Sequence, residues 1–126
     1  MIVGIGTDVV DIDRFAAALA RRPRLAQRCF TDGERAYCSA KPYPPQHFAA
    51  RFAAKEAVGK ALGIGMTRWQ EVEVVRGRGA PRVLLHGRYA ARGVDLGVGR
   101  VHLSLTHDGG NAIAFAIAET PPDMRG

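Results

Sequence analysis

The feature that most constrains the fold is an alanine-rich helical segment, RFAAKEAVGKALGIG, at residues 51–65. Its small apolar residues would surround the helix axis, and a helix that is apolar all round is normally buried. Gly63 follows the last apolar turn and is expected to end the helix. The segment nevertheless carries four charged side chains, which are Arg51, Lys55, Glu56 and Lys60. On a buried helix, each of these charges needs either a structural partner or a function.

Asp8 is a second acidic residue without an evident structural task. Residues 1–7 alternate glycine with apolar side chains and predict a first strand, with Asp8 where that strand ends. Asp11 is better placed to cap the helix expected over residues 12–21. Asp8 is then either a turn or cap residue, or it joins Glu56 in holding Mg²⁺. That ion is typically bound by one or two carboxylates, with water and phosphate oxygens completing its shell.

The basic residues of the long helix would complement such a metal site. Lys55 and Lys60 could neutralise charge on phosphate groups, and Arg51 could hold a further anionic oxygen. An equally ordinary interpretation of Lys55 is a helix residue with a buried stem and a solvated ammonium. The glycines after the helix, Gly63 and Gly65, could be caps or could let backbone N–H groups approach a phosphate.

Local patterns predict the remaining elements. Alternating side chains predict strands at residues 69–76, 82–86, 101–106 and 112–118. Short helices are expected after Pro23, after the capping box that Thr31 and Glu34 spell, and over residues 87–92 before Gly93. Residues 39–46, with three prolines, predict a loop, and residues 119–126 predict a frayed tail. The late clustering of strands favours an α+β fold, with a mostly antiparallel sheet packed against the long helix.

Strand 112–118 is apolar on both faces, which predicts burial on both sides and hints at a subunit interface.

Length, charge and cysteine content narrow the class of protein. The 126 residues suit one domain, and no apolar run approaches the ~18 residues of a membrane span. The N-terminus lacks the basic start of a signal peptide, and Cys29 and Cys38 are expected to be reduced thiols in the cytoplasm. The net charge of +6 favours an anionic partner or reflects composition bias. Aromatic residues are not interleaved with the basic ones, which disfavours a nucleic-acid stacking surface.

Several motifs, in this order, resemble one known family. They are IVGIGTDVVDIDRF at the start, FT-x-x-E, RFAAKEAVGKALGIG, a W-x-x-VEV strand and HLSLTH near the end. The chain is similar over nearly its whole length to the holo-acyl-carrier-protein synthases, a small bacterial branch of the 4′-phosphopantetheinyl transferase superfamily. The resemblance implies one transferase domain over residues 1–126. That domain would move phosphopantetheine from coenzyme A to a serine of apo acyl carrier protein, for fatty acid biosynthesis, leaving adenosine 3′,5′-bisphosphate.

The resemblance also assigns roles to the charged residues. Asp8 and Glu56 would be the Mg²⁺ ligands, with Lys60 adding positive charge at the pyrophosphate. Residues expected to contact coenzyme A are Arg51, Lys55, Lys60, Gly63, Gly65, Ser104 and His107. The base that takes the serine proton is left open, with water poised by Asp8 or Glu56 preferred over a histidine.

The family further implies two kinds of partner. The first helix, with Arg14 and Arg21, would dock the acidic carrier protein, and the chain would form a homotrimer that binds coenzyme A between protomers. No nucleic acid and no membrane are expected as partners. The loop SAKPYPPQH and the turn DGGN depart from the family pattern, which leaves local nucleotide contacts open.

Two other classes of function compete with the transferase. A basic nucleic-acid-binding module would use the arginine-rich faces but would leave Asp8 and Glu56 without a role. A Mg²⁺-dependent phosphohydrolase would use the same site to activate water.

Overall fold

The computed structural model describes residues 1–122 of the chain. Its helices are α1 (Ile12–Arg21), α2 (Leu25–Cys29), α3 (Asp32–Ser39), α4 (Pro44–Leu62), the 3-10 helix η1 (Trp69–Glu71) and α5 (Gly87–Leu96). Its strands are β1 (Ile2–Asp11), β2 (Val72–Val75), β3 (Arg82–Leu85), β4 (Arg100–Asp108) and β5 (Asn111–Glu119). Among the described residues, no helix has the length and apolar character needed to cross a bilayer.

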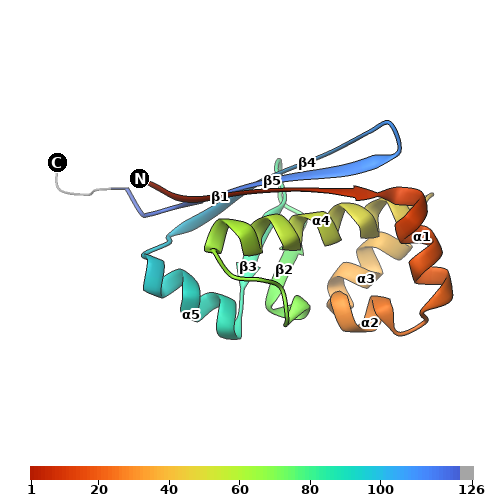
Figure 1. Ribbon diagram of the computed structural model, residues 1–126, viewed down its shortest axis with the longest axis horizontal. Helices are drawn as coiled ribbons and strands as arrows, with labels where there is room; N and C mark the ends of the chain where they lie inside the picture. Colours follow the sequence, from red (N-terminus) through yellow and green to blue (C-terminus); the bar gives the residue numbers. More distant parts are fainter. Residues whose placement is uncertain (123–126) are drawn as a thin grey trace.

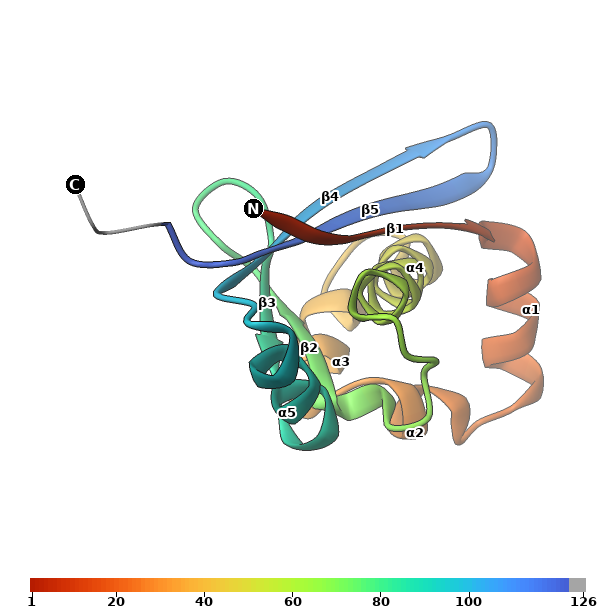
Figure 2. The same ribbon diagram turned by 60° about the vertical axis from the view of Figure 1, so that its left-hand side comes forward.

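One long helix and a three-stranded sheet organise the chain. Strands β1, β5 and β4 form an antiparallel sheet in that order, and β2 and β3 form a separate hairpin. Helix α4 lies along one face of the sheet, with α1, α2 and α3 near its N-terminal end and α5 near its C-terminal end (Figure 1 and Figure 2). The predicted α+β class, with an antiparallel sheet packed against a long helix, is confirmed.

Small residues let α4 approach the sheet closely. The inward face of β5 consists of alanines that are fully buried, which are Ala112, Ala114, Ala116 and Ala118. On β1, a Cβ atom at Gly4 would lie 1.7 Å from the carbonyl oxygen of Ala61, and one at Gly6 would lie 1.8 Å from that of Ala57. Only glycine fits these two positions, so the glycines of the first strand serve the close approach that the sequence predicts.

The helix termini that carry local capping signals lie where the sequence predicts them. The carboxylate of Asp11 accepts a hydrogen bond from the Arg14 N–H at 3.0 Å and begins α1. Thr31 and Glu34 form the reciprocal capping box of α3. Gly63, with a φ of 73°, ends α4.

The start of α4 differs from the prediction. The expected loop over residues 39–46 is wrong in its second half, because α4 begins at Pro44. Pro44 and Pro45 occupy the first helical turn, where a missing N–H group costs nothing because it would have no partner within the helix. The prolines therefore initiate the helix instead of preventing it.

Two further boundaries lie later than predicted. Strand β1 continues to Asp11 because it pairs with β5 along its length, so Asp8 lies within the strand, opposite Ala114. Helix α5 passes through the predicted end at Gly93 and stops at Gly97, which has a φ of 72°. Gly93 is buried inside α5, next to Leu85, where a small residue is needed for packing.

The predictions at residues 69–71 and 119–126 also need correction. Residues 69–71 form η1, and the strand begins only at Val72. Glu119 still belongs to β5, and the Thr120 N–H donates to the carbonyl oxygen of Met1 at 2.9 Å. Glu119 and Thr120 are therefore not part of a frayed tail. Residues 123–126 of the predicted tail lie outside the described part of the chain.

The outer face of the three-stranded sheet is apolar and open. Phe115 on β5 is 45% exposed, and Ile5 and Val9 on β1 are 56% and 59% exposed. The prediction that β5 is buried on both sides is therefore wrong for the single chain, because only its alanine face is covered by α4. Large exposed apolar faces are found at protein-interaction, membrane-binding and ligand-binding sites.

Candidate active site

Asp8, Glu56 and Lys60 lie together where β1 crosses α4. Asp8 shares the inward face of β1 with Gly4 and Gly6, and this face turns toward α4. The Lys60 ammonium lies 3.3 Å from Oδ1 of Asp8 and donates to the carbonyl oxygen of Thr7 at 2.9 Å. Two sequence-distant segments, the first strand and the end of the long helix, thus bring their charged residues to one place.

The electrostatics of this cluster favour a cation. Burial raises the pKa of Glu56, the negative charge of Asp8 raises it further, and the positive charge of Lys60 opposes both effects. Two carboxylates that repel each other beside a single lysine leave negative charge uncompensated when both are ionised. A divalent cation would remove this repulsion.

The two carboxylates fit Mg²⁺ better than a metal ion that takes all of its ligands from the protein. Within residues 1–122, no three side chains of His, Cys, Asp or Glu gather into a metal-binding group. A pair of carboxylates is the set that Mg²⁺ commonly uses when water and substrate phosphates supply the other ligands. Asp8 and Glu56 would be the protein ligands of such an ion.

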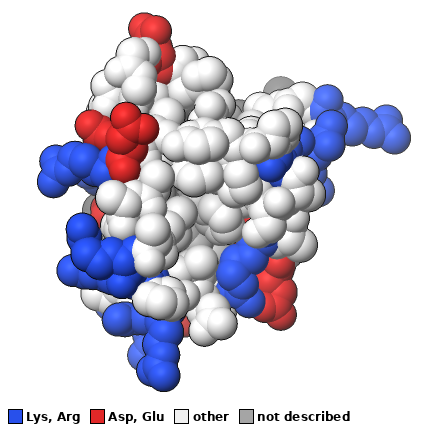
Figure 3. All heavy atoms as spheres, turned by 90° about the vertical axis from the view of Figure 1, so that its right-hand side faces the viewer, with Lys and Arg blue, Asp and Glu red and all other residues white. Residues whose placement is uncertain are grey.

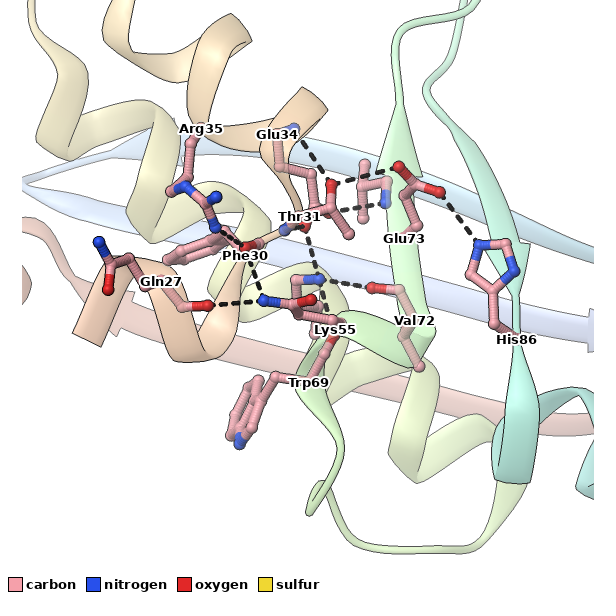
Figure 4. A network of polar contacts seen from close by, with 12 residues as sticks. Gln27, Phe30, Thr31, Glu34, Arg35, Lys55, Trp69, Val72, Glu73 and His86 are labelled. Carbon is pink, nitrogen blue, oxygen red and sulfur yellow. Dashed lines mark hydrogen bonds and ion pairs between the residues drawn. The ribbon is translucent and has the colours of Figure 1, made fainter. Parts of the chain in front are cut away.

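Lys55 does not belong to this cluster. Its side chain is fully buried, and it donates to Glu34 at 2.8 Å and to the backbone carbonyl oxygens of Trp69 and Val72 at 2.8 and 2.5 Å (Figure 4). Burial lowers the pKa of Lys55, and the charge and hydrogen bond of Glu34 oppose this effect. The expectations that Lys55 contacts coenzyme A or holds a solvated ammonium are therefore wrong, because all three of its donors are used inside the protein.

Arg51 belongs to a second group of cationic side chains. Arg51 is 5% exposed, its guanidinium carbon lies 4.0 Å from the ring centroid of Tyr37, and its Nε–H has no hydrogen-bond partner within residues 1–122. Burial lowers the pKa of His47, and the nearby charges of Lys41, Arg51 and His107 lower it further. This concentration of positive charge with an unused donor suits an anionic group.

The sequence did not single out Tyr37, His47 or Lys41 for this second group. Tyr37 lies in α3, Lys41 in the turn before α4 and His47 in the first turns of α4, and they come together only because α3 packs against α4. The cationic group and the Asp8–Glu56–Lys60 cluster involve different side chains of α4 and share no hydrogen bond among the described contacts.

The other predicted site residues are spread over the molecule. Gly63 and Gly65 form the turn after α4, where the carbonyl oxygen of Gly65 accepts a hydrogen bond from the Tyr89 hydroxyl at 2.9 Å. Ser104 is exposed and pairs with Phe115 on the outward face of the sheet. His107 pairs with Ala112 and lines a small pocket with Gln46 and Ala50.

A larger cleft, of about 820 Å³, lies away from the acidic cluster. It is lined by residues 77–86 and 98–103, from the β2–β3 hairpin and the start of β4. Neither Asp8 nor Glu56 lines it. The cleft has basic side chains, including Arg78, Arg82 and Arg100, but lacks the Asp8–Glu56–Lys60 cluster, so it is not the candidate active site.

The basic end of the molecule is a separate surface. Figure 3 looks onto the side on which α1 and α2 lie, where several lysine and arginine side chains gather. The exposed arginines of this region are Arg14, Arg21, Arg22, Arg24 and Arg28. The two residues predicted to dock a partner, Arg14 and Arg21, are thus solvent-accessible.

Comparison with known proteins identifies the class to which this fold and site belong. The sequence pattern of the 4′-phosphopantetheinyl transferase superfamily matches residues 4–117, so the chain belongs to that superfamily. Within it, the chain is 52% identical over 122 residues to a holo-[acyl-carrier-protein] synthase of Frankia casuarinae, covering 94% of this chain and 98% of that one.

Solved structures agree with the sequence comparison. The chain is similar to the holo-[acyl-carrier-protein] synthase of Neisseria meningitidis, with a TM-score of 0.84 and 30% identity over 95% of this chain and all of that one. It is also similar to the Helicobacter pylori holo-[acyl-carrier-protein] synthase in complex with coenzyme A, with a TM-score of 0.79 and 26% identity over 91% and 99% of the two chains. The family resemblance predicted from the motifs is confirmed.

Proposed function

We propose that this chain is a holo-acyl-carrier-protein synthase that acts as one transferase domain. It transfers 4′-phosphopantetheine from coenzyme A to a serine hydroxyl of apo acyl carrier protein and releases adenosine 3′,5′-bisphosphate, which serves fatty acid biosynthesis. The observation that carries this proposal is the meeting of Asp8, Glu56 and Lys60 at the crossing of β1 and α4. Its relatives, which match nearly the whole chain, bear the same activity in their names.

The proposed chemistry needs the pyrophosphate of coenzyme A to be neutralised and oriented. Asp8 and Glu56 would hold a Mg²⁺ ion, which when bound stabilises negative charge on the pyrophosphate oxygens. Lys60 adds a positive charge beside them, and its contacts with Asp8 and with the Thr7 carbonyl oxygen fix the direction of its ammonium. Charge neutralisation and positioning supply most of the catalysis in phosphoryl transfer.

The same cluster offers an acceptor for the serine proton. The carboxylates of Asp8 and Glu56 are the acceptors that this cluster offers, either directly or by orienting a water molecule. We assign proton acceptance to Glu56, directly or through a water molecule. His47 and His107 belong to the cationic group around Arg51 and are not part of this cluster.

The cationic group around Arg51 supports a second part of the proposal. The positive charge of the Arg51 guanidinium and the nearby His107 would attract a phosphate of the nucleotide end of coenzyme A. We propose that coenzyme A lies between protomers, with the acidic cluster of one protomer at its pyrophosphate and the cationic group of a neighbour at its nucleotide phosphate. The exposed apolar face of the sheet supports a homotrimer built on β1 and β5.

Replacing Phe115 by glutamate is expected to prevent this assembly. Phe115 is exposed in the protomer, so the variant should fold, whereas burying its charge in an interface costs several kcal/mol per ion. Sedimentation velocity should find the parent as a trimer and the variant as a monomer that lacks activity. The matched control is Val94→Glu on α5, at a position that is 79% exposed, which should stay trimeric and active. A trimeric, active Phe115→Glu would contradict the proposed interface.

Reversing the charge of Arg14 is expected to weaken binding of the carrier protein. Arg14 is exposed in the first turn of α1, where glutamate is compatible with the helix dipole, so the fold should be kept. The KM for apo acyl carrier protein should rise about tenfold, equivalent to about 1.4 kcal/mol, with the affinity for coenzyme A unchanged. Arg76→Glu, an exposed arginine after β2, is the control and should behave as the parent. Equal loss of both affinities would remove the docking role of α1.

The thiols fit a cytoplasmic protein and exclude a cysteine nucleophile. Cys29 and Cys38 are free, and burial raises the pKa of both thiols, that of Cys38 to about 11. Buried thiols of this kind are inert, and reduced cysteines are usual in the cytoplasm, where we propose that the enzyme acts.

Intact-protein mass spectrometry tests the proposed activity. Apo acyl carrier protein incubated with this protein, coenzyme A and Mg²⁺ should gain the mass of one phosphopantetheine group, and no gain with a competent carrier would contradict the proposal. Release of adenosine 3′,5′-bisphosphate from coenzyme A without any carrier would favour a phosphohydrolase instead.

A further inference from the structure

Helix α4 presents an unusually uniform surface to the rest of the protein. Its buried residues surround the axis and are mostly small, namely Phe48, Ala49, Arg51, Ala53, Ala54, Lys55, Ala57, Val58, Gly59, Ala61 and Leu62. Short side chains interlock little with their neighbours, so rotation of the helix about its own axis is limited by its backbone contacts with β1 and by its few longer side chains. The direction of Glu56 depends on that rotation, because successive residues of a helix point about 100° apart.

Polar contacts of Lys55 supply the directional restraint that the alanines lack. The three donors of its ammonium reach Oε1 of Glu34 and the carbonyl oxygens of Trp69 and Val72. Figure 4 shows Lys55 pointing from α4 toward the start of α3 and the segment that enters β2. Lys55 and Glu34 are both fully buried as an ion pair, so no water competes for these bonds.

Glu34 is fixed in turn from the other side. Its Oε1 accepts from the Thr31 N–H and its Oε2 from the Val74 N–H, both at 2.8 Å. The Thr31 hydroxyl lies 3.2 Å from Oε2 of Glu73, extending the network to β2. The pair therefore ties α4 to two elements with every charged oxygen and nitrogen satisfied.

The two restraints on α4 lie on opposite sides of the helix. Ala57 and Ala61 face Gly6 and Gly4 of β1. Lys55 precedes Ala57 by two residues, which corresponds to a rotation of about 200°. Glu56 lies between these positions in the sequence and projects from the flank, so its direction is set by both contacts.

We propose that the buried Lys55–Glu34 pair is a positioning device that fixes the rotation of α4 and thereby holds Glu56 and Lys60 against Asp8 during phosphopantetheine transfer. This inference rests on the proposed metal site at Asp8 and Glu56. Buried ion pairs contribute little net stability compared with apolar residues of the same volume, and their best attested role is to specify register. A role of this kind explains why a charged pair is kept in the protein core, at a position of α4 that an apolar residue could fill.

The test is Lys55→Met, which keeps the length and apolar stem of the side chain but removes the ammonium. The matched control is Leu96→Ala on α5, a partly buried core residue away from the polar pair, which loses packing without touching the network. Both variants are compared with the parent at a temperature where thermal unfolding curves show each of them on its native baseline. The readouts are kcat, the KM for apo carrier protein, the Mg²⁺ concentration that gives half-maximal rate, and the crystal structure of the metal-free variant.

Lys55→Met should lower kcat at least tenfold and raise the Mg²⁺ requirement several-fold, with an unchanged KM for the carrier. In its metal-free crystal structure, the 3.3 Å contact between Lys60 and Asp8 should be lost. Leu96→Ala should keep the parent's kcat and Mg²⁺ requirement. If Lys55→Met does not fold, Glu34→Gln, which keeps an oxygen acceptor for Lys55, should show a smaller change in the same direction.

Two results would overturn the inference. The first is a folded Lys55→Met, or a folded Glu34→Gln, with kcat, Mg²⁺ requirement and the Lys60–Asp8 contact as in the parent. The second is an equal loss of kcat in Leu96→Ala. That result would mean that the Lys55–Glu34 pair affects kcat only through the stability of the fold. A parent enzyme whose activity does not depend on Mg²⁺ would instead refute the proposed metal site, so the two failures are distinguishable.

Discussion

Replacing Glu56 by glutamine is expected to lower kcat by about 10²–10³-fold without disrupting the fold. Stabilisation of charge by a bound metal ion is worth several kcal/mol, and each 1.36 kcal/mol corresponds to about a factor of ten in rate. The amide keeps the size of the side chain but is a poor ligand for Mg²⁺ and cannot accept the serine proton. Initial rates of holo carrier formation over a range of Mg²⁺ concentrations measure the effect. An undiminished rate would contradict the role given to Glu56.

The same substitution is expected to stabilise the metal-free protein slightly at neutral pH. Burial and Asp8 raise the pKa of Glu56 in the folded state, so the folded protein binds a proton more tightly than the unfolded chain does. The stability of the parent therefore falls as the pH rises from the ordinary glutamate pKa through the raised one, and stays lower above that window. Glutamine does not titrate, so its advantage should be present at pH 7 and shrink as the pH falls through the window.

Urea unfolding of metal-free protein at several pH values tests this second effect. Asp95→Asn, at an exposed position on α5, is the control and should leave the stability of the parent unchanged. A Glu56→Gln variant that is less stable than the parent at pH 7 would mean that Glu56 forms a stabilising contact in the folded protein. The expected combination, lower activity with higher stability, is typical of residues placed for function.

Replacing Gly6 by alanine is expected to lower the free energy of unfolding by about 3 kcal/mol or more, at the upper end of overpacking effects. The added Cβ would lie 1.8 Å from the carbonyl oxygen of Ala57 and 2.9 Å from the backbone nitrogen of Ala61. These are backbone atoms of α4, so no side chain can move aside and the helix itself must shift. Any folded remainder should also be less active, because that shift moves Glu56 away from Asp8.

Gly79→Ala is the matched control for this experiment. Gly79 lies in the β2–β3 turn, has an ordinary φ, and a Cβ there would have no neighbour within 4 Å. Urea midpoints should be equal for Gly79→Ala and the parent and much lower for Gly6→Ala. A Gly6→Ala variant with the parent's midpoint would show that α4 can move away from β1 at little cost.

Features set by local chemistry could be predicted from the sequence. Asp11, the Thr31–Glu34 box and Gly63 fix helix termini through backbone hydrogen bonds within a few residues, and all three lie at their predicted places. Asp8 and Glu56 could be singled out because neither had a local structural partner. The structure brings Asp8 on β1 close enough to Glu56 on α4 for its charge to raise the Glu56 pKa.

Features that depend on distant partners could not be predicted in the same way. Lys55 and Lys60 look alike on the helical pattern, but Lys55 meets Glu34 in the core and Lys60 meets Asp8 at the surface. The sequence indicates only a capping role for Glu34, because nothing local shows that its carboxylate also binds a lysine of another helix. Likewise, the burial of Arg51 against Tyr37 becomes visible only when α3 and α4 are packed together.

The most direct test of the central claim is a crystal structure of this protein with coenzyme A and Mg²⁺. We expect the metal ion between the carboxylates of Asp8 and Glu56, the pyrophosphate on that ion with Lys60 beside it, and a nucleotide phosphate at Arg51 and His107 of a neighbouring protomer. A pyrophosphate bound in the cleft between the β2–β3 hairpin and β4, with no metal ion at Asp8 and Glu56, would contradict the account.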